Sequence, residues 1–198
     1  MLHLLGAYFS FVTVHDASHR CARLWFGRLS SIPLMIPYDE FAIMHRNHHK
    51  HTNHRTLDPD HIVQEISPLL WFFAPELYVR YFINYALQEE ANLHSIIGGL
   101  CRYLFFIGVF ITSAITLGVK WTLLHLLFPS RCAFWLLVYF LDYLPHVNLG
   151  KSPKPSVRNL WSQTPAPLWL RVLTQNQCYH KEHHHKPFKS TFDLGQNV

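Results

Sequence analysis

Two long apolar segments in the second half of the chain restrict its fold more than any other feature. Residues 103–119 carry no charged side chain, and Arg102 is the only charge between positions 96 and 119. A helix rises about 1.5 Å per residue, so this stretch is long enough to cross a bilayer core of about 30 Å. Residues 121–141 form a second apolar segment. The sequence therefore predicts one membrane crossing and one return.

The second apolar segment contains two residues that do not suit a simple lipid-facing helix. Pro129 and Arg131 lie in its middle, and an arginine that faces lipid is costly. Two interpretations remain open. Either Pro129 bends a single helix and Arg131 faces the protein, or the turn lies near residues 128–131 and the first helix is long and tilted.

Three other segments complete the expected organisation. Residues 67–87 combine many aromatic side chains with a few charges, which predicts an amphipathic helix at the membrane interface, with an ordinary buried helix as the alternative. Residues 2–14 are apolar but short, so they fit the end of a span better than a signal peptide. Residues 151–167 contain four prolines and predict a surface loop.

The composition excludes several classes of protein. The four cysteines are far apart and form no Cys-x-x-Cys pair, which argues against a disulfide scaffold and fits a reducing compartment. Hydrophobic residues make up 49% of the chain and charged residues 15%, which excludes a disordered chain. The net charge of +5 is spread along the sequence, so no nucleic-acid partner is expected.

Histidine is several-fold more frequent than in ordinary proteins, with 16 copies among 198 residues. Nine of them fall into HDASH at 15–19, HRNHH at 45–49, HKEHH at 180–184 and a single His146. Spacings of three and four place residues on one face of a helix. Imidazoles that converge in this way bind metal ions. The motifs therefore predict a metal centre.

The predicted topology places all four histidine groups at one membrane face. The 25 residues between His19 and His45 are too few to cross a membrane and return, and both predicted spans lie between His49 and His146. The segment that leads to His180 contains no apolar stretch long enough to cross. A single shared metal centre requires this arrangement.

The distribution of lysine and arginine predicts which side that face is on. Six of the 17 lie within residues 15–61 and seven within residues 150–190. Cytoplasmic loops carry an excess of these residues. The histidine face is therefore expected to be cytosolic, or stromal in a plastid.

The number and surroundings of the histidines narrow the choice of metal. Nine imidazoles exceed the four ligands of a structural zinc ion, and the chain has no HExxH motif. They divide well between two five- or six-coordinate ions, and imidazole suits iron. The alternative is a metal store or transporter, which predicts histidine and acidic residues inside the spans, where only His125 occurs.

The motifs resemble the three histidine boxes of the membrane fatty acid desaturase superfamily, whose members activate dioxygen at a di-iron centre. The boxes correspond to HDASH, HRNHH and HKEHH. Three flanking segments look most like the β-carotene hydroxylase branch, with the related ketolases next: HHKHTNHRTLDPDH at 48–61, LDYLPH at 141–146 and QNQCYHKEHH at 175–184. The resemblance runs from about residue 14 to residue 185.

The resemblance implies nine ligands to two Fe²⁺ ions: His15, His19, His45, His48, His49, His146, His180, His183 and His184. Asp142 stands where some relatives carry an asparagine that contacts iron through water. It would bind iron, orient a ligand imidazole, or be a plain surface acid. The same three roles are open for Asp16, and we favour the one in which it orients a ligand imidazole. His51, His54 and His61 after the second box are expected to be polar surface residues, with a role as extra ligands as the alternative. Asp58 and Asp60 are expected to bind an arginine or cap a turn.

The fold expected from these arguments is all-α. It is an integral membrane protein of a single domain, residues 1–198, with interfacial amphipathic helices and long helices that carry a cytosolic-side histidine cluster. Relatives usually have a membrane hairpin before the first box. With 14 residues before His15, that hairpin is expected to be missing or shortened.

The implied chemistry is the dioxygen-dependent oxidation of a lipid C–H bond, most consistent with hydroxylation of a carotenoid-like ring. An acyl-lipid or acyl-CoA desaturase is the first alternative, and an inactive or non-enzymatic metal-binding membrane protein is the second. An electron donor such as ferredoxin or cytochrome b5 would dock on the basic cytosolic face. The positive-inside bias alone explains that face equally well.

Overall fold

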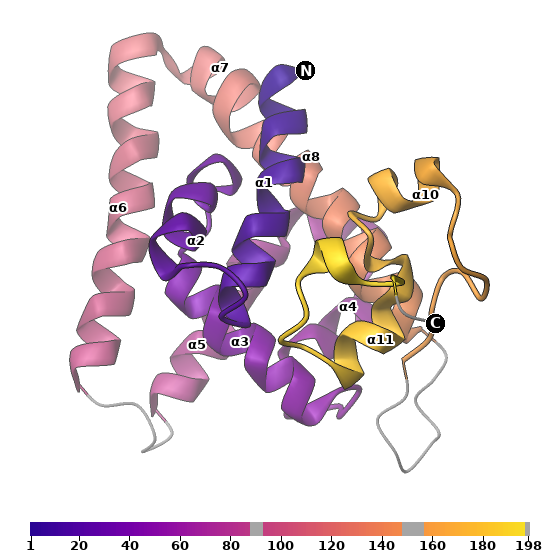
Figure 1. Cartoon of the computed structure of the whole chain (residues 1–198). Coiled ribbons are helices and arrows are strands. Elements are labelled where there is room, and N and C mark those ends of the chain that lie inside the picture. The colour runs from indigo at the N-terminus through magenta and orange to yellow at the C-terminus, as the bar shows by residue number, and fades with distance from the viewer. Residues whose placement is uncertain (88–92, 148–156, 197–198) are drawn as a thin grey trace.

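The computed structural model describes residues 1–87, 93–147 and 157–196. Within these ranges it describes every side chain except those of residues 85, 86 and 93–95. This part of the chain is helical and contains no strand (Figure 1). Its α-helices are α1 (Leu2–Ser18), α2 (Leu24–Ser30), α3 (Tyr38–His51), α4 (Ile62–Glu65), α5 (Ala74–Leu87), α6 (Leu93–Leu117), α7 (Val119–Thr122), α8 (Phe128–Leu137), α9 (Leu144–His146), α10 (Leu168–Leu173) and α11 (His180–His185).

Short 3₁₀ and π-helical turns connect these helices. The 3₁₀ turns are η1 (Ile32–Leu34), η2 (Pro59–His61), η3 (Pro68–Phe73), η6 (Gln177–Tyr179) and η7 (Thr191–Asp193). Two π-helical turns, η4 (Leu123–Leu127) and η5 (Val138–Tyr143), lie inside a longer helix. That helix runs without a break from Val119 to His146.

The two expected membrane crossings are present as two helices long and apolar enough to span a bilayer. The first is Ile96–Leu117 of α6, whose apolar window has no buried residues, and the second is Val119–His146, with 39% of its window buried. They join at Gly118, whose φ of +91° strongly favours glycine. Figure 1 shows α6 at one edge of the molecule, whereas α8 passes beside α1 in the interior.

One of the two interpretations of the second crossing is confirmed. A single helix passes through Pro129, which follows the π-helical turn η4, and the chain turns earlier, at Gly118. Arg131 is only 6% exposed and faces the protein. Its Nε donates to Glu76 Oε1 of α5 at 2.9 Å, and its guanidinium also donates to the Leu34 carbonyl. The charge is therefore paired within the protein instead of facing lipid.

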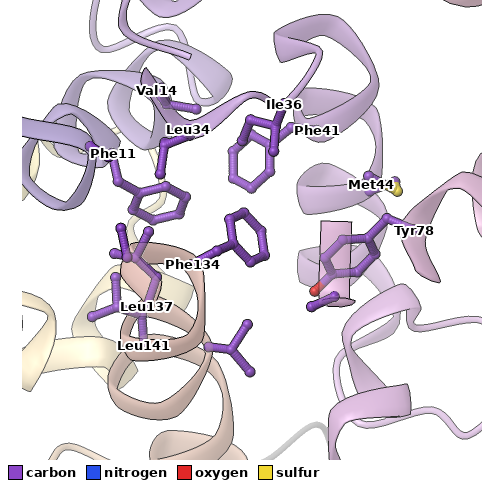
Figure 2. Packing of buried hydrophobic residues seen from close by; sticks show 14 of the residues in the cluster. Phe11, Val14, Leu34, Ile36, Phe41, Met44, Tyr78, Phe134, Leu137 and Leu141 are labelled. Atoms are coloured by element: carbon purple, nitrogen blue, oxygen red, sulfur yellow. The ribbon is translucent and has the colours of Figure 1, made fainter. Parts of the chain in front are cut away.

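The apolar core lies where α1, α3, α5 and α8 meet. Phe11 of α1, Phe41 of α3 and Phe134 of α8 are buried, and the rings of Phe11 and Phe41 meet edge to face with centroids 5.4 Å apart. Figure 2 shows these three rings pointing into the same space, with Tyr78 of α5 and Met44 on its opposite side. This core holds the ends of α1 and α3 that carry histidines.

The segment at 67–87 forms η3 and the amphipathic helix α5, as expected. Tyr78 and Phe82 are buried against the core, whereas Phe73 and Ile83 are exposed. One face of α5 is therefore part of the protein core. Placement of the other face at a membrane interface stays a prediction.

The start of α3 is fixed by charge as well as by packing. Asp39 and Glu40 occupy its first turn, where the positive end of the helix dipole favours carboxylates. Glu40 is fully buried and accepts a hydrogen bond from Arg102 Nε of α6 at 3.0 Å. This ion pair ties the lipid-exposed crossing to the helix that carries HRNHH.

The C-terminal segment folds back against the histidine-bearing helices. Its α10, η6 and α11 surround a second small core in which Leu170, Tyr179 and Leu194 are buried. Asn176 Nδ2 donates to the carbonyls of Thr191 and Leu194 and so holds the last turns in place. The loop expected at 151–167 begins outside the described residues, and the part from 157 to 167 contains no helix.

Candidate metal centre

Four helices present the motif histidines to one region of the interior. These residues are His15 of α1 and His19 directly after its last residue, His45, His48 and His49 of α3, His146 of α9, and His180, His183 and His184 of α11. Each motif is helical, so the spacings of three and four do place its histidines on a shared face. Residues as distant as His15 and His183 come into contact, and all nine histidines lie together.

The first group contains His15, His19, His45 and His183, whose ligand nitrogens all lie within 4.8 Å of one another. His15 Nε2 is 3.1 Å from His183 Nε2. His49 adjoins this group, because its Nε2 lies 3.0 Å from His183 Nε2 and 3.3 Å from His45 Nε2.

The second group contains His48, His146, His180 and His184, again with ligand nitrogens within 4.8 Å of one another. His180 Nε2 lies 2.9 Å from His146 Nε2 and 3.1 Å from His184 Nε2. His184 Nε2 is 3.3 Å from His48 Nε2. The ring of His49 stacks on that of His184 with centroids 4.2 Å apart, so the two groups are adjacent.

Hydrogen bonds at Nδ1 orient two rings of the second group. His48 Nδ1–H donates to Asp58 Oδ1 at 2.9 Å, and His180 Nδ1–H donates to Gln177 Oε1 at 3.2 Å. An acceptor at Nδ1 keeps a proton there, so that in the neutral ring the lone pair is on Nε2. Both Nε2 atoms therefore face the group as metal-binding atoms.

Two further rings are held in the same way. Thr52 donates its hydroxyl proton to the His48 carbonyl at 2.8 Å, so its oxygen is free to accept from His184 Nδ1 at 3.3 Å. In the first group, His15 Nδ1 faces Asp16 Oδ1 at 3.4 Å. The pattern of a ring fixed from behind by an acceptor is that of metal-ligating histidines.

The spacing of the nitrogens fits bound cations. Where both rings of a pair hold their proton on Nδ1, as in His180 and His184, the two Nε2 lone pairs face each other at 3.1 Å and repel, because they lack a proton to share. Nitrogens about 2.1 Å from one ion lie about 3.0 Å apart when the bonds are at right angles. The donor set therefore fits two ions, one for each group.

The electrostatics of the first group favour neutral imidazole, the form that binds metal. Burial, followed by repulsion from neighbouring imidazoles, lowers the pKa of His45 and His183 well below the usual value. The same causes lower the pKa of His19 to about 3. These rings hold no proton that a metal ion would have to displace near neutral pH.

His48 in the second group behaves differently. Burial by itself lowers the pKa of His48, but the charges of Asp58 and Asp60 outweigh burial and raise it to about 10. A metal ion at His48 would displace the Nε2 proton, while Asp58 keeps the proton on Nδ1.

The two acids singled out in the sequence occupy different places. Asp16 is buried beside His15 and also accepts hydrogen bonds from Ser190 Oγ at 2.7 Å and from the backbone N–H of Thr191 at 3.1 Å. Asp142 lines the cavity next to the second group, and its Oδ2 is buried without a hydrogen-bond partner. Either position suits an acid that supports or approaches a bound ion.

Sequence analysis missed the residues that fix the second group. Asp58 caps η2 by accepting from Asp60 N–H at 2.9 Å, as expected of a turn cap, but its bond to His48 was not anticipated. Gln177 stands three residues before His180, a helical spacing that offered a usable clue. Thr52 follows His48 by four residues and offered the same clue.

An apolar cavity of about 60 Å³ adjoins both histidine groups. Histidines of both groups form one end of its wall, with Asp60, Asp142 and Gln177 nearby. The rest of the wall is apolar or aromatic and consists of Phe11, Phe41, Met44, Tyr78, Phe134, Leu137, Val138 and Leu141, most of which Figure 2 labels. This is the arrangement of a site in which a few polar groups face an apolar substrate.

Comparison with known proteins assigns the family. A sequence profile of fatty acid desaturases matches residues 1–197. A stretch of 64 residues is 39% identical to sn-1 oleoyl-lipid 12-desaturase of Anabaena variabilis and covers 29% of this chain and 18% of that protein. The chain thus matches less than a fifth of that curated relative's length, and no solved structure matches it significantly. Because the profile spans almost the whole chain, this protein belongs to the fatty acid desaturase family.

Proposed function

We propose that this protein is a di-iron, dioxygen-dependent oxidoreductase that oxidises a C–H bond of a lipid. The observation that carries the proposal is the apolar cavity whose end wall is made by histidines of both groups. A lipid segment in this cavity would lie directly against the proposed metal centre. Side-chain acids and bases alone do not break an unactivated C–H bond, so an oxidising cofactor is needed.

The nine histidines are the proposed iron ligands. His15, His19, His45, His49 and His183 would hold one Fe²⁺ ion, and His48, His146, His180 and His184 would hold the other. When bound, the two ions supply, with dioxygen and an external reductant, the oxidising power for the reaction. The fit rests on the converging Nε2 lone pairs and on the acceptors that fix Nδ1.

The protein's own contribution is orientation and the exclusion of water. Asp58 and Gln177 hold His48 and His180 in the tautomer that binds metal. The aromatic and aliphatic wall positions the apolar segment of the substrate and keeps water away from the site. Asp142 would orient or approach the second ion, and Asp16 would support His15.

Two substrate classes remain, each favoured by a specific observation. The segments around the histidine boxes favour hydroxylation of a carotenoid-like ring. The 64-residue match to an oleoyl-lipid desaturase favours formation of a double bond in an acyl chain. Both reactions begin with the removal of hydrogen from carbon, and the histidine geometry serves both.

We also propose that the histidine face is cytosolic, or stromal, and meets a separate electron donor. Lys50 of α3 and Lys181 of α11 are exposed on this side, next to histidines of their own helices. An acidic carrier such as ferredoxin or cytochrome b5 would complement this charge. A reporter fused after Val198 should be accessible from the cytosol, and a lumenal signal would overturn this orientation.

Expression in cells that make β-carotene tests the function. New hydroxylated pigment, absent from cells that express a His48→Ala variant, supports ring hydroxylation. Unchanged carotenoids together with new unsaturated acyl chains would establish the desaturase alternative instead. Unchanged pigments and lipids, with purified protein that binds no iron, would leave a non-enzymatic membrane protein.

A further inference from the structure

Three adjoining cavities lead from the histidines to the lipid-exposed helix α6. The inner cavity of about 60 Å³ is the one against the histidine groups. A neck of about 10 Å³ follows, and beyond it lies an outer cavity of about 350 Å³. Beyond the neck, the cavity volume is therefore largest next to α6, the first predicted membrane crossing.

Side chains that line two cavities at once show that the three are adjacent. Phe41, Met44, Tyr78 and Phe134 line both the inner cavity and the neck. These four side chains form the partition between the inner cavity and the neck. Figure 2 shows Phe41 and Phe134 on one side and Tyr78 and Met44 on the other. The neck and the outer cavity likewise share a wall made of Pro37, Pro75 and Tyr103.

The outer cavity lies between α5, α6 and α8. Phe106, Ile107 and Phe110 of α6 form part of its wall. The apolar window of α6 has no buried residues, and Ile107 is 52% exposed. In a bilayer this side of α6 faces acyl chains, so the outer cavity opens toward lipid.

We propose that the lipid substrate reaches the histidines laterally from the bilayer, through the outer cavity, and that Tyr78 and Phe134 form the gate that selects which segment passes. The proposal rests on the proposed function for the identity of the substrate. The route itself rests on the three cavities and on the exposure of α6.

The size of the neck requires the gate to move. A cavity of about 10 Å³ holds at most about one water molecule. An acyl chain or an isoprenoid ring passes only if Tyr78 and Phe134 separate. The partition therefore admits a narrow apolar segment and keeps water out of the inner cavity between turnovers.

An ion pair fixes the two helices that carry the gate. Glu76 of α5 pairs with Arg131 of α8 at the wall of the outer cavity. Tyr78 follows Glu76 by two residues, and Phe134 follows Arg131 by three. Side-chain motion at the gate can then occur without separation of the helices.

Photo-crosslinking tests the route without any need for turnover. The full chain is placed in phosphatidylcholine vesicles that contain a phosphatidylcholine with a diazirine at the end of one acyl chain. After irradiation, labelled residues are mapped by mass spectrometry of peptides. In the wild-type protein we expect labels on Met44, Tyr78 and Phe134, in addition to the outer surface of α6.

Two independent substitutions block the outer cavity from opposite walls, Ile107→Trp on α6 and Val79→Trp on α5. Both should abolish the labels on Met44 and Phe134. The matched control is Ile115→Trp, which adds the same bulk to α6 at a residue that is 78% exposed and outside the cavity wall. Helical content measured by circular dichroism verifies that each variant is folded.

A variant that widens the gate should increase labelling of the inner cavity instead of abolishing it. Phe134→Ala widens the partition and should increase labelling of Leu141, which lines the inner cavity. Wild-type labelling of Met44 in both folded blocking variants, or labels confined to α6 in the wild type, would overturn the route. Labels in the gate without oxidised lipid in the expression test would leave the route standing and reject the proposed function.

Discussion

The two histidine groups differ in what supports them. In the first group, Asp16 behind His15 also binds Ser190 and Thr191, which lie more than 170 positions further along the chain. In the second group, Asp58 behind His48 also accepts from the nearby N–H groups of Asn53 and Asp60. Support of the ligand and attachment of the C-terminal segment therefore coincide in the first group. At His48 of the second group, the supporting bonds of Asp58 are local in sequence.

The largest expected effect is a change in iron content when one ligand is removed from either group. His183→Ala should release the ion of the first group, and His184→Ala should release that of the second, so each variant should bind about half the iron of the wild type. His185→Ala is the matched control, because it lies in the same helix and is exposed. Metal analysis of the purified proteins provides the measurement. If either variant alone loses all the iron, the two groups do not act as separate sites.

The next effect concerns the acid behind the second group. Asp58→Asn removes the charge that faces His48 Nδ1, and loss of such a supporting residue lowers metal affinity about 10–100-fold. Chelator competition measures this affinity. Glu65→Gln, which removes an exposed partner of Arg55, should leave the affinity unchanged.

Asp16→Asn should instead lower stability. Its buried carboxylate accepts hydrogen bonds from Ser190 and Thr191, and a bond to a charged group contributes about 1.5–3 kcal/mol. Denaturant unfolding of the metal-free protein in detergent should show a loss of about 2 kcal/mol. Ser190→Ala removes one of these bonds and should produce a smaller loss. Unchanged stability of the Asp16→Asn protein would contradict the proposed role of Asp16 in attaching the C-terminal segment.

The smallest effect lies at the edge of the first group. Burial raises the pKa of Glu182, but hydrogen bonds from Lys189 and from the Gly195 N–H outweigh it and lower the pKa below the usual value. A lowered folded-state pKa contributes stability above the unfolded pKa of about 4.3, and that stability is lost as pH falls through the folded value. Glu182→Gln should therefore cost about 1 kcal/mol or less at pH 7. The difference from wild type should shrink in unfolding curves as the pH is lowered below about 4.3.

The helices and the membrane crossings were accessible from sequence because their patterns are local. A long uncharged stretch predicts a span from length alone, and two such helices are present. The placement of Arg131 was not accessible. Its partner Glu76 lies 55 positions away, and only the packing of α5 on α8 brings the two together.

The sequence by itself determined which histidines meet, because each motif keeps its imidazoles on one face of a helix and span counting places the motifs at one membrane face. Only the tertiary structure decided how they divide. Neighbours on α3 and α11 separate, with His45 and His183 in one group and His48 and His184 in the other. It also decided that Asp58 holds His48. A helical repeat fixes the direction of a side chain around its own axis, whereas contacts across helices depend on how α1, α3, α8 and α11 pack.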